Sequence, residues 1–110
     1  MWKKIEAVLR PYKVQEIIEQ LEERKIHFYL EDCVGFGRRL SPLSLYKKES
    51  PLPAQSLPRT RMTLFLPQRD EDWAVSLILE RGDTGIAGDG KIFITPVIRG
   101  MDIETREIYD

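Results

Sequence analysis

A glycine-rich run at residues 83–94, DTGIAGDGKIFI, is the stretch most suited to binding chemistry. Gly85, Gly88 and Gly90 let the backbone adopt positive φ angles, and consecutive amides in such a turn can form a concave anion site. Lys91 would add a mobile positive charge at the rim. Gly-Asp-Gly is also common in plain tight turns, so the run predicts either a phosphate cradle or a structural turn. It precedes a strand pattern, whereas Rossmann and Walker loops precede helices.

The composition is that of one soluble globular domain. The chain has 110 residues and a hydrophobic content of 42%, which suits a single core. The formal net charge of −1 gives no general attraction to nucleic acid or to an anionic membrane, so neither is expected as a partner. No apolar run approaches the roughly 20 residues of a membrane span, so we expect no direct membrane insertion.

Cysteine and histidine are too scarce for a disulfide or a zinc site. Cys33 is the only cysteine and His27 the only histidine, which excludes an internal disulfide, and no metal site is expected. Such cysteine usage is typical of a cytoplasmic protein. The sequence offers no nucleophile beside a general base, so we nominate no catalytic residue and expect a protein that is not an enzyme.

The hydrophobic periodicity predicts the element order β-α-β-β-α-β. Apolar residues from 14 to 21 recur at i, i+3, i+4 and i+7, which indicates an amphipathic helix. The predicted strands are 5–9, 27–36, 59–66 and 91–98, and the predicted helices begin at 13 and span 70–81. This order indicates an α+β, ferredoxin-like βαββαβ fold with two helices on one face of the sheet.

Three of the predicted strands are apolar at both parities, so the uncovered face of the sheet would also carry apolar side chains. A monomer should not expose such a patch, and an oligomer is predicted. RNA-recognition modules share this element order, but their stacking aromatics lie on the first and third strands. Here the first has no aromatic residue and the third has Phe65 alone, so RNA binding is disfavoured.

At this point the residues resemble the PII nitrogen-regulatory signal-transduction family. Residues 3–13, KKIEAVLRPYK, look like its opening strand and helix entry, and Gly35-Phe36-Gly37-Arg38 is similar to its strand-two exit. Residues 84–97 look like its B-loop and following strand. The resemblance implies one PII-like domain over 1–110 that forms a homotrimer, with a T-loop at 37–58, a B-loop at 82–91 and a C-terminal tail at 99–110.

In that family adenine nucleotides bind in clefts between subunits. The resemblance carries this role to nine positions of this chain: Gly35, Gly37, Arg38, Thr84, Gly88, Asp89, Gly90, Lys91 and Tyr29. Tyr29 stands where the family has a small hydroxyl residue near the adenine. It could stack on a base or fill the pocket.

Two acidic residues depart from the family pattern. Nucleotide-binding members carry an Arg-x-Arg pair after strand four, and the aligned residues here are Asp102 and Glu104. At ~4 Å a carboxylate and a phosphate charge repel by about 1 kcal/mol in water and about 4 kcal/mol at an effective dielectric near 20. This favours ADP or AMP over ATP as the adenine nucleotide, unless the tail swings away or a cation bridges the carboxylates to a phosphate.

A further departure concerns 2-oxoglutarate. Arg39 replaces the family's glutamine that helps to hold the magnesium ion chelating 2-oxoglutarate. Arginine cannot ligate a metal, although it can pair with a carboxylate directly. Binding of 2-oxoglutarate with magnesium by the family mechanism is therefore disfavoured.

The T-loop differs most from the family. Leu43, Tyr46, Lys47 and Lys48 would offer apolar anchors and steering charges to a protein target, such as a membrane transporter or a metabolic enzyme. The loop's leucines could instead fold back on the trimer. The sequence thus indicates a regulator that binds a small effector and controls a partner through its T-loop. The alternative is a nucleotide-blind paralogue acting as a constitutive adaptor or hetero-trimer subunit.

Overall fold

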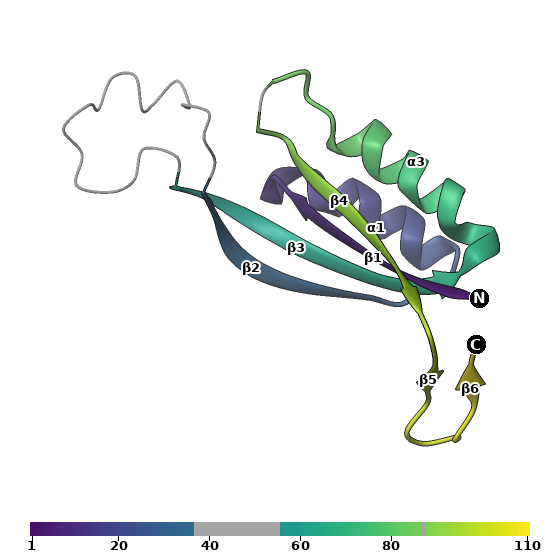
Figure 1. Ribbon diagram of the computed structural model, residues 1–110. Helices are drawn as coiled ribbons and strands as arrows, with labels where there is room; N and C mark the ends of the chain where they lie inside the picture. Colours follow the sequence, from purple (N-terminus) through teal and green to yellow (C-terminus); the bar gives the residue numbers. More distant parts are fainter. Residues whose placement is uncertain (37–55, 87) are drawn as a thin grey trace, which may run out of the picture.

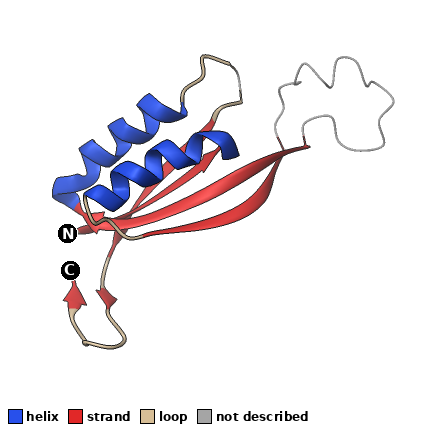
Figure 2. Ribbon diagram, turned by 180° about the vertical axis from the view of Figure 1, so that it is seen from behind, coloured by secondary structure: helices blue, strands red, loops and turns tan. Residues whose placement is uncertain are grey.

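The computed structural model describes residues 1–36, 56–86 and 88–110. Its elements are β1 (Trp2–Leu9), η1 (Pro11–Lys13), α1 (Val14–Glu23), β2 (Phe28–Phe36), β3 (Ser56–Pro67), η2 (Gln68–Asp70), α3 (Glu71–Gly82), β4 (Gly90–Val97), β5 (Gly100–Met101) and β6 (Ile108–Tyr109). A four-stranded antiparallel sheet, ordered β2-β3-β1-β4, is covered on one face by α1 and α3 (Figure 1, Figure 2). The predicted α+β, ferredoxin-like fold is confirmed.

The core lies between the helices and one face of the sheet. β1 pairs with β3 on one side and with β4 on the other, so that Ile5 lies opposite both Leu64 and Ile94. Side chains alternate along a strand, and the parity of Ile5 and Leu64 faces the helices, where both are fully buried. The other core residues are Ala7, Leu9, Val14, Ile17, Leu21, Met62, Leu66, Ala74, Leu77 and Ile78.

α1 presents one apolar stripe to the sheet. Pro11 opens the preceding η1, where a residue without an N–H is tolerated and its fixed φ favours a helical turn. After it the predicted apolar spacing buries Val14, Ile17 and Leu21. Burying one such side chain contributes about 1.5–3 kcal/mol, which holds α1 on the sheet.

The C-terminus of α1 ends in a left-handed turn that the sequence did not indicate. Lys25 has φ +60. Its amide donates to the carbonyl of Glu22 (3.0 Å), and the Ile26 amide donates to that of Leu21 (3.0 Å). This is the Schellman arrangement, in which glycine is the usual residue at the left-handed position.

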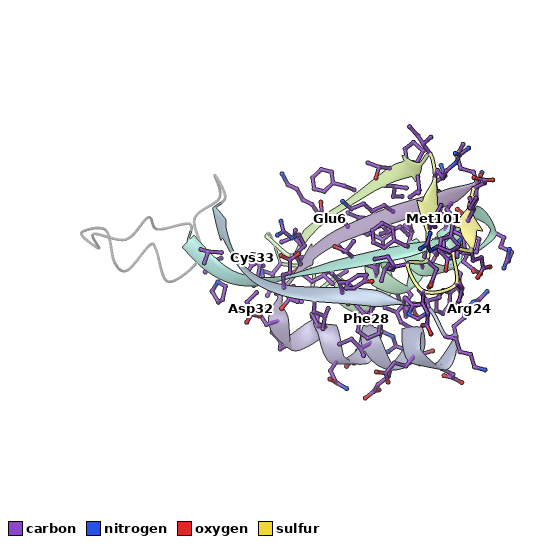
Figure 3. All side chains as sticks on the ribbon, turned by 90° about the horizontal axis from the view of Figure 1, so that it is seen from below. Glu6, Arg24, Phe28, Asp32, Cys33 and Met101 are labelled. Carbon is purple, nitrogen blue, oxygen red and sulfur yellow. The ribbon has the colours of Figure 1, made fainter. Side chains whose placement is uncertain are left out.

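The sheet face turned away from the helices mixes apolar and charged side chains. Tyr29, Phe65 and Phe93 are exposed there. Arg61 lies among them and approaches Glu6 at 4.0 Å; Figure 3 shows Glu6 on this side of the sheet, away from α1. The predicted apolar character of the second face is confirmed for these aromatic residues, although charges separate them.

The β2–β3 hairpin extends beyond the helices (Figure 1). β3 begins at Ser56, so the predicted strand of 59–66 was too short at its N-terminal end, and the T-loop assignment of 37–58 stays a prediction. Pro58 suggested loop in the sequence. Pairing with β1 ends at Thr60, so β3 has only β2 beside it at Pro58, and a proline is tolerated in a strand with one neighbour.

The predicted polar tail, residues 99–110, folds into a small hairpin. β5 pairs with β6 in the register Gly100–Tyr109. The ring of Tyr109 lies 4.7 Å from that of Trp2, centroid to centroid, which attaches the tail to the first residue of β1. Figure 1 shows this hairpin at the end of the sheet away from the outer end of the β2–β3 hairpin.

The helices of the described residues include none that is long and apolar enough to cross a membrane.

Truncating a buried leucine should lower the free energy of unfolding much more than truncating an exposed one. Leu64→Ala removes a fully buried side chain and should lower the free energy of unfolding by roughly 2–5 kcal/mol. Leu79→Ala, on α3 and 57% exposed, is the matched control and should change it by about 0.5 kcal/mol or less. Urea denaturation of both variants measures this, and similar losses would contradict the assigned core.

Candidate functional site

The B-loop joins α3 to β4 at the end of the sheet where β1 finishes. The predicted B-loop of 82–91 overlaps Gly82, the last residue of α3, and Gly90, the first residue of β4, and its assignment stays a prediction. Gly85, Gly88 and Gly90 have φ of +78, +91 and +140. The positive φ angles expected from the sequence are therefore present.

Gly90 is required by the close approach of two backbones. A Cβ at this position would lie 1.8 Å from the carbonyl oxygen of Val8. Gly90 is paired with Leu9 in the β1–β4 ladder, so any side chain would force β4 away from β1. The first residue of β4 thus has to be glycine for the B-loop to end where it does.

The Asp89 carboxylate holds the B-loop together. It accepts hydrogen bonds from the Thr84 amide (2.8 Å), from the Thr84 hydroxyl, and from Nε of Arg10 (2.9 Å). Partial burial raises the pKa of Asp89, but the hydrogen bonds from Thr84 and the charge of Arg10 outweigh it and lower that pKa from 3.8 to about 2. Asp89 is therefore a charged structural link between the two ends of the loop and the end of β1.

The first amides of the turn are already hydrogen-bonded within the loop. The Gly85 amide donates to the Asp83 carboxylate (2.8 Å), and the Ile86 amide donates to the Thr84 hydroxyl (3.2 Å). The Thr84 amide is bound by Asp89. An anion would have to use the amides from Gly88 onward, beside Lys91, or displace these contacts. Fewer amides are therefore available to bind an anion than the glycine pattern suggested.

Two arginines that the sequence did not single out lie beside Gly88. Nη2 of Arg59 donates to the Gly88 carbonyl at 2.8 Å. A Cβ at Gly88 would be 3.8 Å from Nη2 of Arg59 and equally far from Nη2 of Arg10. Burial and then the charge of Arg10 lower the pKa of the Arg59 guanidinium. Arg10 follows β1 and Arg59 lies in β3, so only the pairing of these strands brings them together.

Of the residues predicted at the exit of the second strand, the structure places Gly35 beside Arg59. Gly35 lies near the end of β2, opposite Leu57, and a Cβ there would be 3.2 Å from Cγ of Arg59. Gly37 and Arg38 lie outside the described residues, as do the predicted partner-binding residues Leu43, Tyr46, Lys47 and Lys48. Their predicted roles remain predictions.

Tyr29 is not part of this group within one chain. It lies six residues before Gly35, about 20 Å along β2 at 3.3 Å per residue. Its side chain is 63% exposed on the open face of the sheet, with its ring 6.3 Å from that of Phe65. Any site shared by Tyr29 and the B-loop would have to combine residues of two subunits.

The acidic tail residues lie away from their own B-loop. The Asp102 carboxylate accepts from the amides of Glu104 (2.9 Å) and Thr105 (2.8 Å) and so closes the turn of the β5–β6 hairpin. The amide of Thr105 in particular lowers the pKa of Asp102. The hairpin is attached at Trp2, whereas the B-loop lies at the other end of β1.

A separate groove of about 440 Å³ lies between α1 and the edge strand β2. Its lining includes Val14, Ile18, Leu30, Asp32 and Thr60, and none of the predicted site residues lines it. In Figure 3 Asp32 lies on the helix side of the sheet. No group of three or more His, Cys, Asp or Glu residues in the described ranges is placed to hold a metal ion.

Comparison with known proteins identifies the family. Residues 2–107 match the family described as Nitrogen regulatory protein P-II. The chain is 33% identical over 106 residues to a nitrogen regulatory protein P-II of Haemophilus influenzae, covering 96% of this chain and 94% of the relative. It is 33% identical over 109 residues to nitrogen regulatory protein P-II 1 of Escherichia coli K12, covering 98% and 96%. It is 34% identical over 106 residues to a P-II protein of Azospirillum brasilense.

The chain belongs to the nitrogen regulatory protein P-II family. It is therefore a signalling regulator and not an enzyme, as the sequence indicated.

Replacing Gly90 should damage the fold more than replacing another glycine of the same loop. Gly90→Ala places a Cβ against the Val8 carbonyl, and we expect a loss of unfolding free energy of roughly 3 kcal/mol or more. Gly85→Ala is the control, because its Cβ would meet nothing within 4 Å and only the positive φ costs about 1–2 kcal/mol. Urea denaturation measures both, and equal losses would show that the close approach to β1 is not limiting.

The Asp89 link should make stability depend on acid pH. Its pKa is lower in the folded protein than in the unfolded chain, so its contribution is complete above about pH 4 and is lost as pH falls towards 2. The difference in unfolding free energy between the wild type and Asp89→Asn should decline over that interval by about 2 kcal/mol.

Two controls accompany this measurement. Thr84→Val removes the hydroxyl donor but keeps the amide, so it should reduce the pH-dependent part without abolishing it. Asp110→Asn changes a carboxylate that is 76% exposed and should leave the pH profile as in the wild type. An Asp89→Asn profile parallel to that of the wild type from pH 5 to pH 2 would contradict the assigned role.

Proposed function

We propose that this P-II family regulator binds an adenine nucleotide at the B-loop, in clefts between the subunits of a homotrimer, and controls a protein target through its T-loop. The observation that carries the proposal is the convergence of Arg10 and Arg59 on a B-loop whose glycines have positive φ and which leads directly to Lys91 in β4. Positive charge beside a glycine-rich turn attracts a phosphate group, which would use the amides from Gly88 onward. We expect the protein to act in the cytoplasm, and we expect its target to be a membrane transporter or a metabolic enzyme.

A homotrimer is supported by two exposed surfaces. Tyr29, Phe65 and Phe93 lie uncovered on the open face of the sheet. Ile98 and Ile103, before and within the tail hairpin, are exposed by 93% and 91%. Apolar surface of this kind favours association. It also offers a way to bring Tyr29 of one subunit to the B-loop of another, where the ring could stack on a base or fill the pocket.

The acidic tail supports ADP or AMP over ATP. Asp102 carries its charge at neutral pH, as an ordinary aspartate does, and the hydrogen bonds of the turn lower its pKa further. Two negative charges in place of the family's two arginines disfavour a third phosphate if a neighbouring subunit's tail reaches the cleft. Magnesium-dependent binding of 2-oxoglutarate is not part of the proposal, because Arg39 cannot supply a metal ligand.

Titration calorimetry with ATP, ADP, AMP and 2-oxoglutarate, each with and without magnesium, tests the proposal. We expect ADP or AMP to bind more tightly than ATP, and no magnesium-dependent binding of 2-oxoglutarate. A lack of response to every nucleotide would instead support the nucleotide-blind adaptor or hetero-trimer subunit. The internal bonding of the Thr84, Gly85 and Ile86 amides favours that second candidate.

Charge reversal in the tail should change nucleotide preference. Glu104→Arg is the cleaner variant, because the side chain of Asp102 closes the turn and that of Glu104 makes no hydrogen bond or ion pair among the described residues. It should strengthen ATP binding by about tenfold or more if the tail reaches the phosphates. Glu19→Arg, the same reversal on the exposed face of α1, is the control and should leave ATP affinity unchanged. If Glu104→Arg does not strengthen ATP binding, the tail does not reach the cleft.

Two further measurements address the assembly and the target. Light scattering should give the mass of three chains in solution. A pull-down comparing the full chain with a deletion of residues 40–54 tests control through the T-loop, and this deletion keeps the paired part of β2 and β3. Capture of the same target by both proteins would contradict a role for the T-loop.

A further inference from the structure

The groove between α1 and β2 exposes an apolar strip on the helix side of the sheet. Val14 and Ile18 of α1 line it from one side, and Leu30 of β2 lines it from the other. Leu30 is 42% exposed, and Val34, four residues further along β2 and on the same side of the strand, is 57% exposed. Water therefore contacts aliphatic side chains where the edge of the sheet passes α1.

β2 also leaves one edge of the sheet open. The strand order is β2-β3-β1-β4, and β2 pairs only with β3 in the part of the chain that the structure describes. Backbone N–H and C=O groups on the outer side of such a strand can pair with an added strand. The opposite edge strand, β4, contains Pro96, which has no N–H to donate, whereas β2, FYLEDCVGF, contains no proline. β2 is therefore the edge better suited to accept another strand.

The surroundings of the groove are acidic. Asp32 lies on the helix side of the sheet (Figure 3), and its carboxylate makes no hydrogen bond or ion pair among the described residues. Glu31, the other acidic residue of the lining, is paired with Arg61 at 3.0 Å. Glu19 and Glu22 follow two lining residues of α1 by about one helical turn, and α1 contains no lysine or arginine. Asp32 is thus the carboxylate of the lining that is available to a cation.

We propose that the groove and the open edge of β2 form a docking site for an extended segment of a partner protein with the pattern aliphatic-x-basic-x-aliphatic. Every second side chain of an added strand faces the groove. The basic group would lie opposite Asp32, and the two aliphatic groups would lie opposite Leu30 and Val34. The pattern reads the same in both strand directions, so it fits a parallel or an antiparallel addition. The site is separate from the B-loop and does not depend on nucleotide binding.

Charge distinguishes this partner from two others. Nucleic acid would bring phosphates towards Asp32 and the glutamates of α1, and like charges repel. A second copy of β2 would place another run containing Glu31 and Asp32 against the same edge, and like charges on directly opposed residues of paired strands are destabilising. A basic group between aliphatic side chains matches both the apolar strip and the carboxylate.

Fluorescence anisotropy of a labelled peptide, SVTKTVS, with the full chain tests the proposal. We expect saturable binding that weakens as salt rises, because the contact with Asp32 is electrostatic. The peptide SVTETVS, in which glutamate replaces lysine, should bind at least about tenfold more weakly. Equal binding of the two peptides, or no binding of SVTKTVS, would overturn the proposal.

Two N-methylated forms of SVTKTVS test strand addition. Each carries methyl groups on one of the two alternating sets of backbone amides, and only one set can face β2. Methylation of that set removes the N–H donors of the added strand and should abolish binding, whereas methylation of the other set should leave it. Equal effects of the two sets would show that the peptide does not extend the sheet.

Charge reversal at Asp32 should exchange the peptide preference. Asp32→Lys should weaken SVTKTVS at least about tenfold and strengthen SVTETVS, an exchange that a general loss of structure would not produce. Glu80→Lys makes the same change of charge on the exposed side of α3 and is the matched control, with the wild-type preference expected. An unchanged preference in Asp32→Lys would overturn the assignment of the groove.

Amide hydrogen exchange of the full chain then locates the peptide. SVTKTVS should slow exchange in β2 and leave α3 unchanged, and the mass from light scattering should be the same with and without peptide. A fall in mass would show that the peptide displaces another subunit, so that this edge is an interface between copies of this chain, and the proposal would be wrong. No nucleotide is added, so failure of the proposed function would leave these measurements unaffected.

Discussion

The pairing of β1 with two neighbours along its whole length is the constraint on which the rest of the structure depends. β1 is the central strand, and the register that places Ile5 opposite Leu64 and Ile94 also places Leu9 opposite Thr60 and Gly90. The residues just beyond these pairs are Arg10, Arg59 and Asp89. A shift of one residue would turn the core face of β1 outwards, so burial of Ile5, Ala7 and Leu9 indirectly fixes where the arginines meet the B-loop.

The candidate site is stabilised by an ion pair and hydrogen bonds within the B-loop and between the B-loop and the neighbouring strand ends. Asp89 is the acceptor for Arg10 and Thr84, and Arg59 donates to backbone carbonyls, so the described residues of the loop are held by contacts within the chain. The same bonds occupy several groups that an anion would otherwise use. An anion would therefore have to bind through groups that remain accessible, notably the exposed Lys91. At the other end of the sheet the charge is reversed, because the tail hairpin there carries Asp102 and Glu104.

Much of the fold could be predicted because it depends on local patterns. The alternation in β3 and the helical spacing in α1 each report one buried face, and both were placed correctly. Glycines were assigned to positive φ correctly because other residues rarely adopt it. Errors occurred where local signals conflict with pairing. Pro58 suggested a loop, but β2 extends the strand to Ser56. Lys25 takes a left-handed position with no glycine to announce it, and the polar tail forms a hairpin through the contact of Tyr109 with Trp2.

The sequence by itself determined the βαββαβ order, the glycine turn before β4 and the acidic Asp102 and Glu104, where the resemblance to the family implies arginines, because each is a property of neighbouring residues or of residue type at a position. Only the tertiary structure decided which side chains surround that turn. All of α1 and β2 and the loop after β2 separate Arg10 from Arg59 in the chain. The two residues meet at Gly88 because antiparallel pairing on both sides of β1 brings their strand ends together. From the sequence, the glycine run could have been a plain turn or an anion cradle. In the folded chain it is a turn closed by hydrogen bonds to the Asp89 carboxylate, with two guanidinium groups beside it.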